Sequence, residues 1–392
     1  MLRPIIARRK LLAFALLAFF LFYWIPFSHV FPGWGPFPLQ FGSYRVFQAT
    51  TIAMWAIVAL GLNLLTGYNG QISLGHGAFV AVGGYTAAIL MFDHGWPFWA
   101  TIPVAGFMTG TVGFLVGVPA LRLTGPYLAI ATLALAISTP QILLKYEGLT
   151  HGSQGINVNS PPPPAVLDGV LNQTQWLYFL ALVIAIIMTI IAWNIVRSRV
   201  GRAFVAIRDS EIAAQAMGIS VPRFKTMAFA ISAFFAGVCG AVYVQVIGFV
   251  SPRSFDVLQS INYLTTVVVG GLASILGSIL GAAAFVLVPE INGLLDQLHL
   301  PAANQAPGVI YGASLILVMI LMPYGLAGFI HRLTRLQPPL VRQSLIDFAQ
   351  QIGLRVRTAR SAPDRGSGAA PTPPKDVRTP RPPDGDKGSS SS

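Results

Sequence analysis

Residues 176–196 read WLYFLALVIAIIMTIIAWNIV, and no Asp, Glu, Lys or Arg interrupts them. An α-helix rises about 1.5 Å per residue, so about 20 apolar residues cross the hydrocarbon core of a bilayer. Similar apolar stretches recur along the chain. We expect membrane-spanning helices at residues 11–26, 46–66, 72–92, 98–119, 127–146, 176–196, 226–250, 257–270, 276–291 and 308–330. The sequence therefore predicts an all-α, polytopic helical membrane protein with about ten transmembrane helices.

The composition agrees with this class. Of the 392 residues, 54% are hydrophobic and 10% are charged, whereas a soluble domain carries about 25% charged residues. Lys and Arg gather before residue 11, in residues 197–225 and beyond residue 331. Because cytoplasmic loops retain basic residues, both termini and the 197–225 loop are expected in the cytoplasm. These bases flank apolar stretches, so a nucleic-acid partner is not expected.

The chain divides into two parts by composition. Residues 1–335 form the predicted transmembrane domain, and residues 336–392 are predicted to be a cytoplasmic, mostly disordered tail rich in Pro, Gly and Ser. The outward stretch 149–175 includes four consecutive prolines, which favour an extended chain. The single cysteine, Cys239, excludes an intrachain disulfide and is interpreted as a small buried hydrophobe. No cofactor or metal site is expected.

Residues 67–79, GYNGQISLGHGAF, interrupt two apolar stretches with glycines and polar side chains. Non-helical backbone at membrane depth is tolerated only when protein buries it or it lines a wet cavity. One interpretation is a candidate translocation path; the favoured one is a tight cytoplasmic turn that caps the next helix. For His76, a helix-end histidine with satisfied hydrogen bonds is favoured over a metal ligand or proton relay. The candidate path residues are Asn63, Asn69, Gln71, Ser73 and His76.

Residues 208–218, RDSEIAAQAMG, predict a short helix inside the 197–225 loop. Asp209 or Ser210 can cap its start, Glu211 suits its positive end, and Gly218 can close it before Pro222. Its apolar face suits docking in a groove of a partner, although packing on its own membrane domain is equally compatible. This face comprises Ile212, Ala213, Ala216 and Met217.

Four GxxxG spacings fall within predicted helices, at Gly106/Gly110, Gly113/Gly117, Gly277/Gly281 and Gly308/Gly312. Small residues one turn apart allow helices to approach closely in lipid. Packing within the chain is favoured over a dedicated dimerisation face.

Residues 61–90, 127–136, 198–218 and 262–289 resemble the branched-chain amino acid permease family of bacterial ATP-driven importers, and its M-type subunit in particular. The resemblance extends over residues 46–329. It implies a multi-pass permease of the bacterial inner membrane that forms a heterodimer with an H-type permease. Two cytoplasmic ATPase subunits and a periplasmic substrate-binding protein are the further partners implied. The ATPase-coupling loop is then represented by Arg208, Asp209, Ser210, Glu211, Ala213, Ala214, Ala216 and Gly218.

One departure from the family concerns the solute. Downstream of Tyr-Leu-Ala-Ile the family commonly has an acidic residue and then an arginine, whereas residues 135–144 here read LAISTPQILL. Branched-chain amino acids are therefore expected together with alternatives such as aromatic acids, amides or other small carboxylates.

The main alternative function is a secondary transporter or channel that needs no ATPase. Proton-coupled carriers usually place acidic residues inside the membrane, and only Glu290 falls within a predicted helix here. An enzyme is disfavoured, because the sequence has no GxxxxGK[ST] phosphate loop, no HExxH and no paired carboxylates at catalytic spacing. Energy from ATP would then have to come from separate subunits.

Overall fold

The structure is a computed structural model that describes residues 43–121, 123, 125–164, 171–297, 312 and 325–328. The predicted helix 11–26 and the predicted tail 336–392 lie outside these residues. Most of the predicted helix 308–330 also lies outside them.

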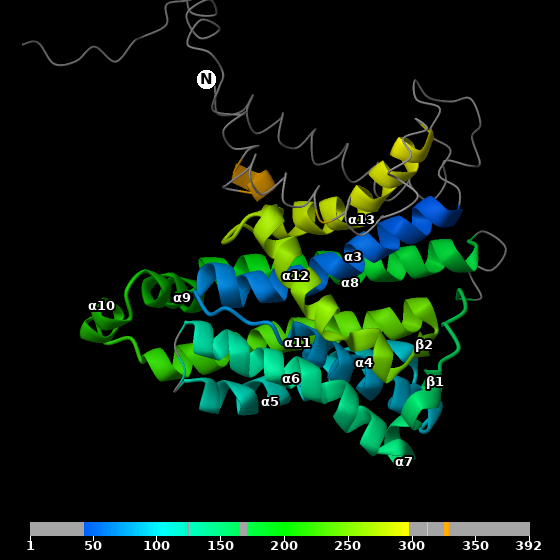
Figure 1. The fold of residues 1–392 in the computed structure, drawn as a ribbon, viewed down its shortest axis with the longest axis horizontal. Helices are drawn as coiled ribbons and strands as arrows, with labels where there is room; N and C mark the ends of the chain where they lie inside the picture. The colour runs from blue at the N-terminus through cyan, green and yellow to red at the C-terminus, as the bar shows by residue number, and fades with distance from the viewer. Residues whose placement is uncertain are drawn as a thin grey trace, which may run out of the picture. The chain divides into compact units, whose positions relative to one another are not determined.

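The described chain is a bundle of long apolar helices (Figure 1). Within the described part, five stretches are long and apolar enough to cross a membrane, and three shorter apolar helices accompany them. Each helix predicted between residues 46 and 291 has a counterpart. These are α3 (Ser43–Asn63), α4 (His76–Phe92), α5 (Phe98–Ala120), α6 (Pro126–Lys145), α8 (Gln173–Arg197), α11 (Val221–Ile247), α12 (Val257–Gly270) and α13 (Ile275–Gln297).

Two predicted boundaries are wrong for identifiable reasons. α11 begins at Val221 instead of residue 226, because Pro222 lies at the first helical positions, where its missing N–H costs nothing. Arg223 and Lys225 therefore belong to a helix and not to the loop. The helix predicted from residue 72 begins only at His76, and the residues before it are not helical.

The predicted inner and outer loops lie at opposite ends of the bundle (Figure 1). At one end are the short helices α9 (Arg199–Asp209) and α10 (Glu211–Ala216). At the other end are α7 (Glu147–Thr150) and the strands β1 (Ile156–Asn157) and β2 (Phe249–Val250). The two strands pair antiparallel, with Ile156 opposite Val250. The four prolines at 161–164 adopt neither helix nor strand.

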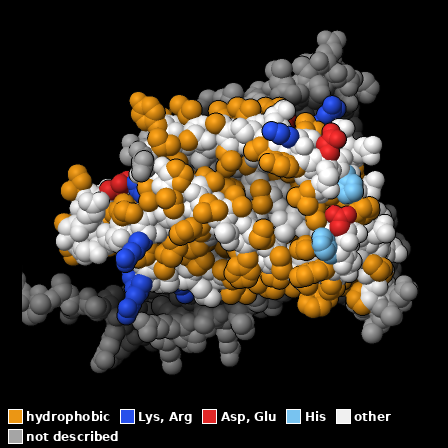
Figure 2. Space-filling model, turned by 90° about the horizontal axis from the view of Figure 1, so that it is seen from below, with side chains coloured by type: hydrophobic (Ala, Val, Ile, Leu, Met, Phe, Trp, Pro, Cys, Tyr) orange, Lys and Arg blue, Asp and Glu red, His pale blue; other side chains and the backbone are white. Residues whose placement is uncertain are grey.

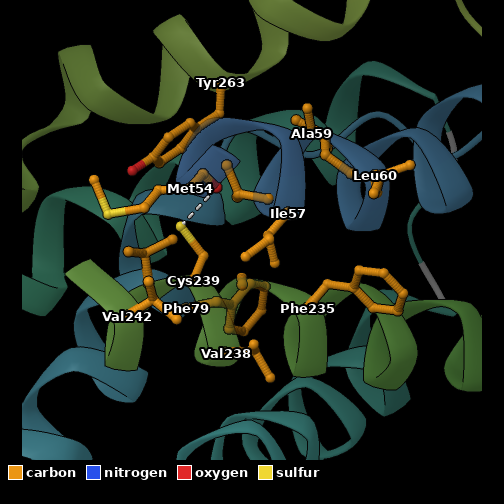
Figure 3. Close-up of a cluster of buried hydrophobic side chains, with 14 of the residues drawn as sticks. Met54, Ile57, Ala59, Leu60, Phe79, Phe235, Val238, Cys239, Val242 and Tyr263 are labelled. Carbon is orange, nitrogen blue, oxygen red and sulfur yellow. Dashed lines mark hydrogen bonds between the residues drawn. The ribbon is translucent and has the colours of Figure 1, made fainter. Parts of the chain in front are cut away.

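α11 is the central helix, and it packs extensively on α5, α4 and α3. Figure 3 shows its side chains Phe235, Val238 and Val242 meeting residues of α3 and α4 in a buried cluster. Cys239 lies in this cluster, where its Sγ donates a hydrogen bond to the Met54 carbonyl at 3.3 Å. The prediction that this cysteine is a small buried hydrophobe is confirmed.

Glycines allow this close packing. The four predicted glycines of α5, from Gly106 to Gly117, all face side chains or backbone of α11, and Gly277 and Gly281 face the C-terminal end of α12. Packing within the chain is thus confirmed for these pairs, while Gly308 lies outside the described residues. The tightest position on α5 is Gly113, where an added Cβ would overlap the Cβ of Ala233.

The outer surface of the bundle is largely apolar. Figure 2 shows hydrophobic side chains spread over the centre of one face, with charged side chains towards its two ends. Such a surface suits a lipid bilayer and not water. Large side chains exposed on α5, α6 and α8 include Trp99, Phe107, Phe114, Leu115, Ile130, Ile137, Ile187 and Ile190.

The α5–α11 contact can be tested with two matched substitutions on one helix. We expect Gly113→Ala to lower the melting temperature of the detergent-solubilised protein, because overpacking costs about 1–3 kcal/mol. Gly110→Ala puts its Cβ at an ordinary 3.4 Å from the Ala230 carbonyl oxygen, and alanine in a helix gains about 1 kcal/mol over glycine. It should therefore leave the melting temperature unchanged or raise it. Equal melting temperatures for the two variants would contradict the packing described.

Candidate functional site

The link between α3 and α4 is a non-helical stretch inside the protein. α3 ends in a π-helical turn, η2 (Leu64–Tyr68), and residues 69–75, here named the broken segment, follow it before α4 begins at His76. Backbone N–H groups around the break bond to side chains: Leu74 donates to Thr132 Oγ1 at 2.9 Å, and Gly77 donates to Ser260 Oγ at 2.9 Å. Side chains of α6 and α12 thus replace the missing helical hydrogen bonds.

A chain of hydrogen bonds fixes the depth of the start of α4. The Ser232 hydroxyl donates to the Gly61 carbonyl at 2.7 Å, so its oxygen accepts from His76 Nε2 at 2.6 Å. The Nδ1 atom of His76 then accepts from the Ser73 hydroxyl at 3.2 Å. Because Ser232 lies near the middle of α11, the break reaches deep into the bundle. The helix-end histidine with satisfied hydrogen bonds is confirmed. The cytoplasmic turn and the translocation path both stay predictions.

The broken segment turns its polar side chains inward. Asn69, Gln71 and Ser73 are buried. Ile72, which lies between two of them, is exposed. The polar side chains proposed for the path thus face protein in this structure. The sequence analysis did not predict that Ile72 is exposed, although polar and apolar residues alternate over 69–74 and such a pattern indicates two different faces.

Asn63 serves a different connection. It is the last residue of α3, and its Nδ2 donates to the Ser274 carbonyl and to Ser278 Oγ, both at 2.8 Å. Its Oδ1 accepts from the Ala273 N–H at 2.8 Å. This side chain holds the turn between α12 and α13 against the end of α3, so the structure does not group it with the buried polar side chains of the broken segment.

The predicted short helix in the 197–225 loop is α10. Ser210 caps it by accepting from the Ala213 N–H at 3.3 Å, and Gly218 follows its end with φ +82°, in the left-handed region. Ile207, Ala214 and Val221 form a small core that joins α9, α10 and α11. α10 is therefore held firmly to the chain on both sides, and Ala214 faces inward.

The opposite face of α10 is open. Ile212 is 83% exposed and Met217 is 82% exposed, and Ala213 and Ala216 are exposed beside them. All four residues of the predicted apolar face thus point away from the bundle, from which α10 projects (Figure 1). Of the two interpretations of this face, packing on its own membrane domain is wrong for these side chains.

The two predicted sites meet at a small polar pocket. Arg208 Nη1 donates to the Gly67 carbonyl at 3.1 Å, and the Arg208 guanidinium also pairs with Asp209 at 3.0 Å. Lys225 is only 8% exposed and pairs with Glu211 at 2.6 Å. Lys225, one of the bases of the predicted cytoplasmic loop, is therefore buried, while its partner Glu211 stays about half exposed. The pocket of about 80 Å³ is lined by residues that include Asn69, Gln71, Arg208, Glu211 and Lys225.

The described residues contain no group of three or more His, Cys, Asp or Glu side chains that could hold a metal ion. What they do contain is a break inside a bundle of long apolar helices and a projecting helix at one end. This is the architecture of a multi-pass helical membrane protein.

Comparison with known proteins gives the family. Residues 44–319 match the family described as branched-chain amino acid transport system / permease component, and the chain belongs to it. A relative in Escherichia coli (strain K12), the high-affinity branched-chain amino acid transport system permease protein LivM, is 34% identical over 314 residues, which cover 74% of this chain and 71% of LivM. The LivH permease of the same system and strain is 27% identical over 311 residues, covering 72% of this chain and 94% of LivH.

The higher identity to LivM than to LivH agrees with the predicted resemblance to the M-type subunit.

A shorter stretch of this chain matches the autoinducer 2 import system permease protein LsrC of Enterobacter sp. (strain 638). The two are 32% identical over 127 residues, which cover 31% of this chain and 36% of LsrC. No solved structure matches the chain.

Proposed function

We propose that this chain is the M-type permease subunit of a binding-protein-dependent, ATP-driven importer in the bacterial inner membrane. Its partners are an H-type permease, two cytoplasmic ATPase subunits and a periplasmic substrate-binding protein. The observation that carries this proposal is the projecting α10, with Ile212 and Met217 almost fully exposed at the end of the bundle where basic residues predict cytoplasm.

The chemistry of α10 suits a docking helix. Two large apolar side chains in water favour burial in a groove of a partner, and the small Ala213 and Ala216 beside them let that partner approach the helix backbone. The core of Ile207, Ala214 and Val221 supports the transmission of force, because it ties α10 to α9 and α11.

The distribution of charge supports ATP as the energy source over a proton gradient. Among the described long helices, only α13 carries acidic residues within its bounds, Glu290 and Asp296. A secondary transporter, the alternative function, would need titratable groups along its path. Because the sequence has no phosphate loop, ATP hydrolysis is assigned to separate subunits.

Branched-chain amino acids are the proposed solutes. The names of LivM and LivH support this class. The departure at residues 135–144 and the match to LsrC keep other small solutes as candidates, among them aromatic acids, amides and small carboxylates.

Reconstitution tests the energy source. The chain is assembled in liposomes with its H-type permease and ATPases, and with the binding protein on one side. We expect uptake of tritiated leucine that requires ATP on the other side and is unaffected by collapse of the proton gradient. Proton-driven uptake by this chain alone, indifferent to ATP, would refute the importer and favour the secondary transporter.

Substitutions on α10 test the docking role. We expect Ala213→Arg and Ala216→Arg to abolish co-purification of the ATPase with normal membrane expression, because a charge buried without a partner costs about 3–5 kcal/mol. Gly218→Val strains a left-handed backbone by about 1–2 kcal/mol and should weaken docking less. As a matched control, Asn194→Arg adds the same side chain at an exposed position of α8.

Co-purification is measured by pull-down from solubilised membranes, and uptake is measured in parallel. If the two α10 arginine variants kept wild-type ATPase binding and transport, α10 would be an ordinary solvated connection. Loss of binding in Asn194→Arg as well would trace the effect to added charge and not to α10.

A further inference from the structure

We infer that Arg208 and Lys225 tie α10 to the broken segment, so that a movement of α10 reaches the hydrogen-bonded cluster of Ser73 and His76 beside the middle of α11. This inference rests on the proposed function, because it takes α10 as the helix that an ATPase moves. Arg208 and Lys225 are positioning residues, since neither is assigned a contact with ATP or solute.

The first tie is Arg208, the penultimate residue of α9 and a neighbour of α10. Its Nη1 donates to the Gly67 carbonyl at 3.1 Å, at the end of the π-helical turn. Its side chain also lies beside Gly70, where an added Cβ would lie 2.9 Å from Arg208 Cγ and where φ is +80°. Arg208 therefore bonds to one side of the start of the broken segment and packs on the other.

The second tie runs through Lys225. Glu211, the first residue of α10, accepts from Lys225 Nζ at 2.6 Å, and the carbonyl of Lys225 accepts from Gln71 Nε2 at 3.3 Å. Gln71 Nε2 also donates to Asn69 Oδ1 at 2.5 Å. Glu211 of α10 and Gln71 of the broken segment are thus both bonded to Lys225 at the start of α11, one through its ammonium group and the other through its carbonyl.

The two ends of the broken segment differ in how tightly they are held. At the deep end, Gly75 lies against the Thr132 backbone and Ser73 bonds to His76. At the other end lies the polar pocket, and Asn69 Nδ2 is buried there without a hydrogen-bond partner. An unpaired buried donor beside a pocket marks a place where the described packing is incomplete. This end has room to rearrange when α10 moves.

A rearrangement at the pocket end would reach the hydrogen-bonded cluster of Ser73 and His76. Only Ile72 separates Gln71 from Ser73, so a shift of the Gln71 backbone acts directly on Ser73. Ser73 bonds to His76, and His76 bonds to Ser232 of the central helix. The exposed Ile72 lies between them and moves with the same stretch.

The test separates coupling from docking and from stability. In the assembled complex with tritiated leucine as the probe, Arg208→Met removes the donor but keeps a long side chain. We expect leucine transported per ATP hydrolysed to fall at least ten-fold, with the ATPase still co-purifying. Arg208→Lys can still donate one hydrogen bond to Gly67, so its ratio of leucine to ATP should lie between those of the wild type and Arg208→Met. The matched control is Arg202→Met on the same helix, since Arg202 is exposed and its side chain donates only to the Arg197 carbonyl among the described contacts.

Gly70→Ala is a second variant that keeps the charge of Arg208: its Cβ meets Arg208 Cγ and it strains a backbone with φ +80°, so it disturbs the start of the broken segment and should lower the same ratio. A wild-type ratio in both Arg208→Met and Gly70→Ala would overturn the inference, as would an equal fall in Arg202→Met. Loss of ATPase co-purification in Arg208→Met would assign Arg208 to docking, which overturns the tie but leaves the proposed function standing. Absence of ATP-driven uptake in the wild-type complex would overturn the proposed function and the tie together.

Discussion

Backbone polar groups inside a membrane protein must find partners within the protein, because hydrocarbon offers none. The break between α3 and α4 is where this constraint is most demanding. Its N–H groups are satisfied by hydroxyls of Thr132 and Ser260, which come from α6 and α12. The arrangement of these helices around α4 thus depends on the break, and the break depends on them.

The central helix α11 connects the features that follow from this constraint. Its first turns carry Lys225, which pairs with α10, and its middle carries Ser232, which holds His76. Its small residues admit α5 and α4 at close range. One rigid helix therefore touches the projecting end, the pocket and the deep end of the broken segment, which is why we assign coupling to this region and not to the outer helices α6 and α8.

The sequence alone predicts helix ends where capping residues and glycines close in the chain set them. The bounds of α12 agree with the prediction because Asp256 caps its start and a glycine pair ends it. α10 was predictable from its capping Ser210 and closing Gly218. Lys225 was misplaced because hydropathy treats a charged residue as exposed, and the Glu211 partner that compensates it is a tertiary contact.

The contacts of the broken segment were not predictable for the same reason. Glycines and polar residues between apolar stretches indicate a break in the helix, and distant residues decide what that break packs against. Thr132, Ser232 and Ser260 lie on three other helices, and none of them stands out in its own apolar stretch. The role of Asn63 was not predictable either, because its partners on the α12–α13 turn lie more than 200 residues away in the sequence.

A movement of α10 that reaches the broken segment requires this segment to shift between the nucleotide-free complex and the complex with trapped ATP. The most direct measurement is the distance between spin labels at Ile72→Cys and Ile187→Cys, in a Cys239→Ala background, with and without trapped ATP. A pair at Phe107→Cys and Ile187→Cys, both exposed on α5 and α8, reports on the surrounding bundle. The account predicts that trapping shifts the first distance and leaves the second unchanged. Two unchanged distances in a complex that hydrolyses ATP would contradict it.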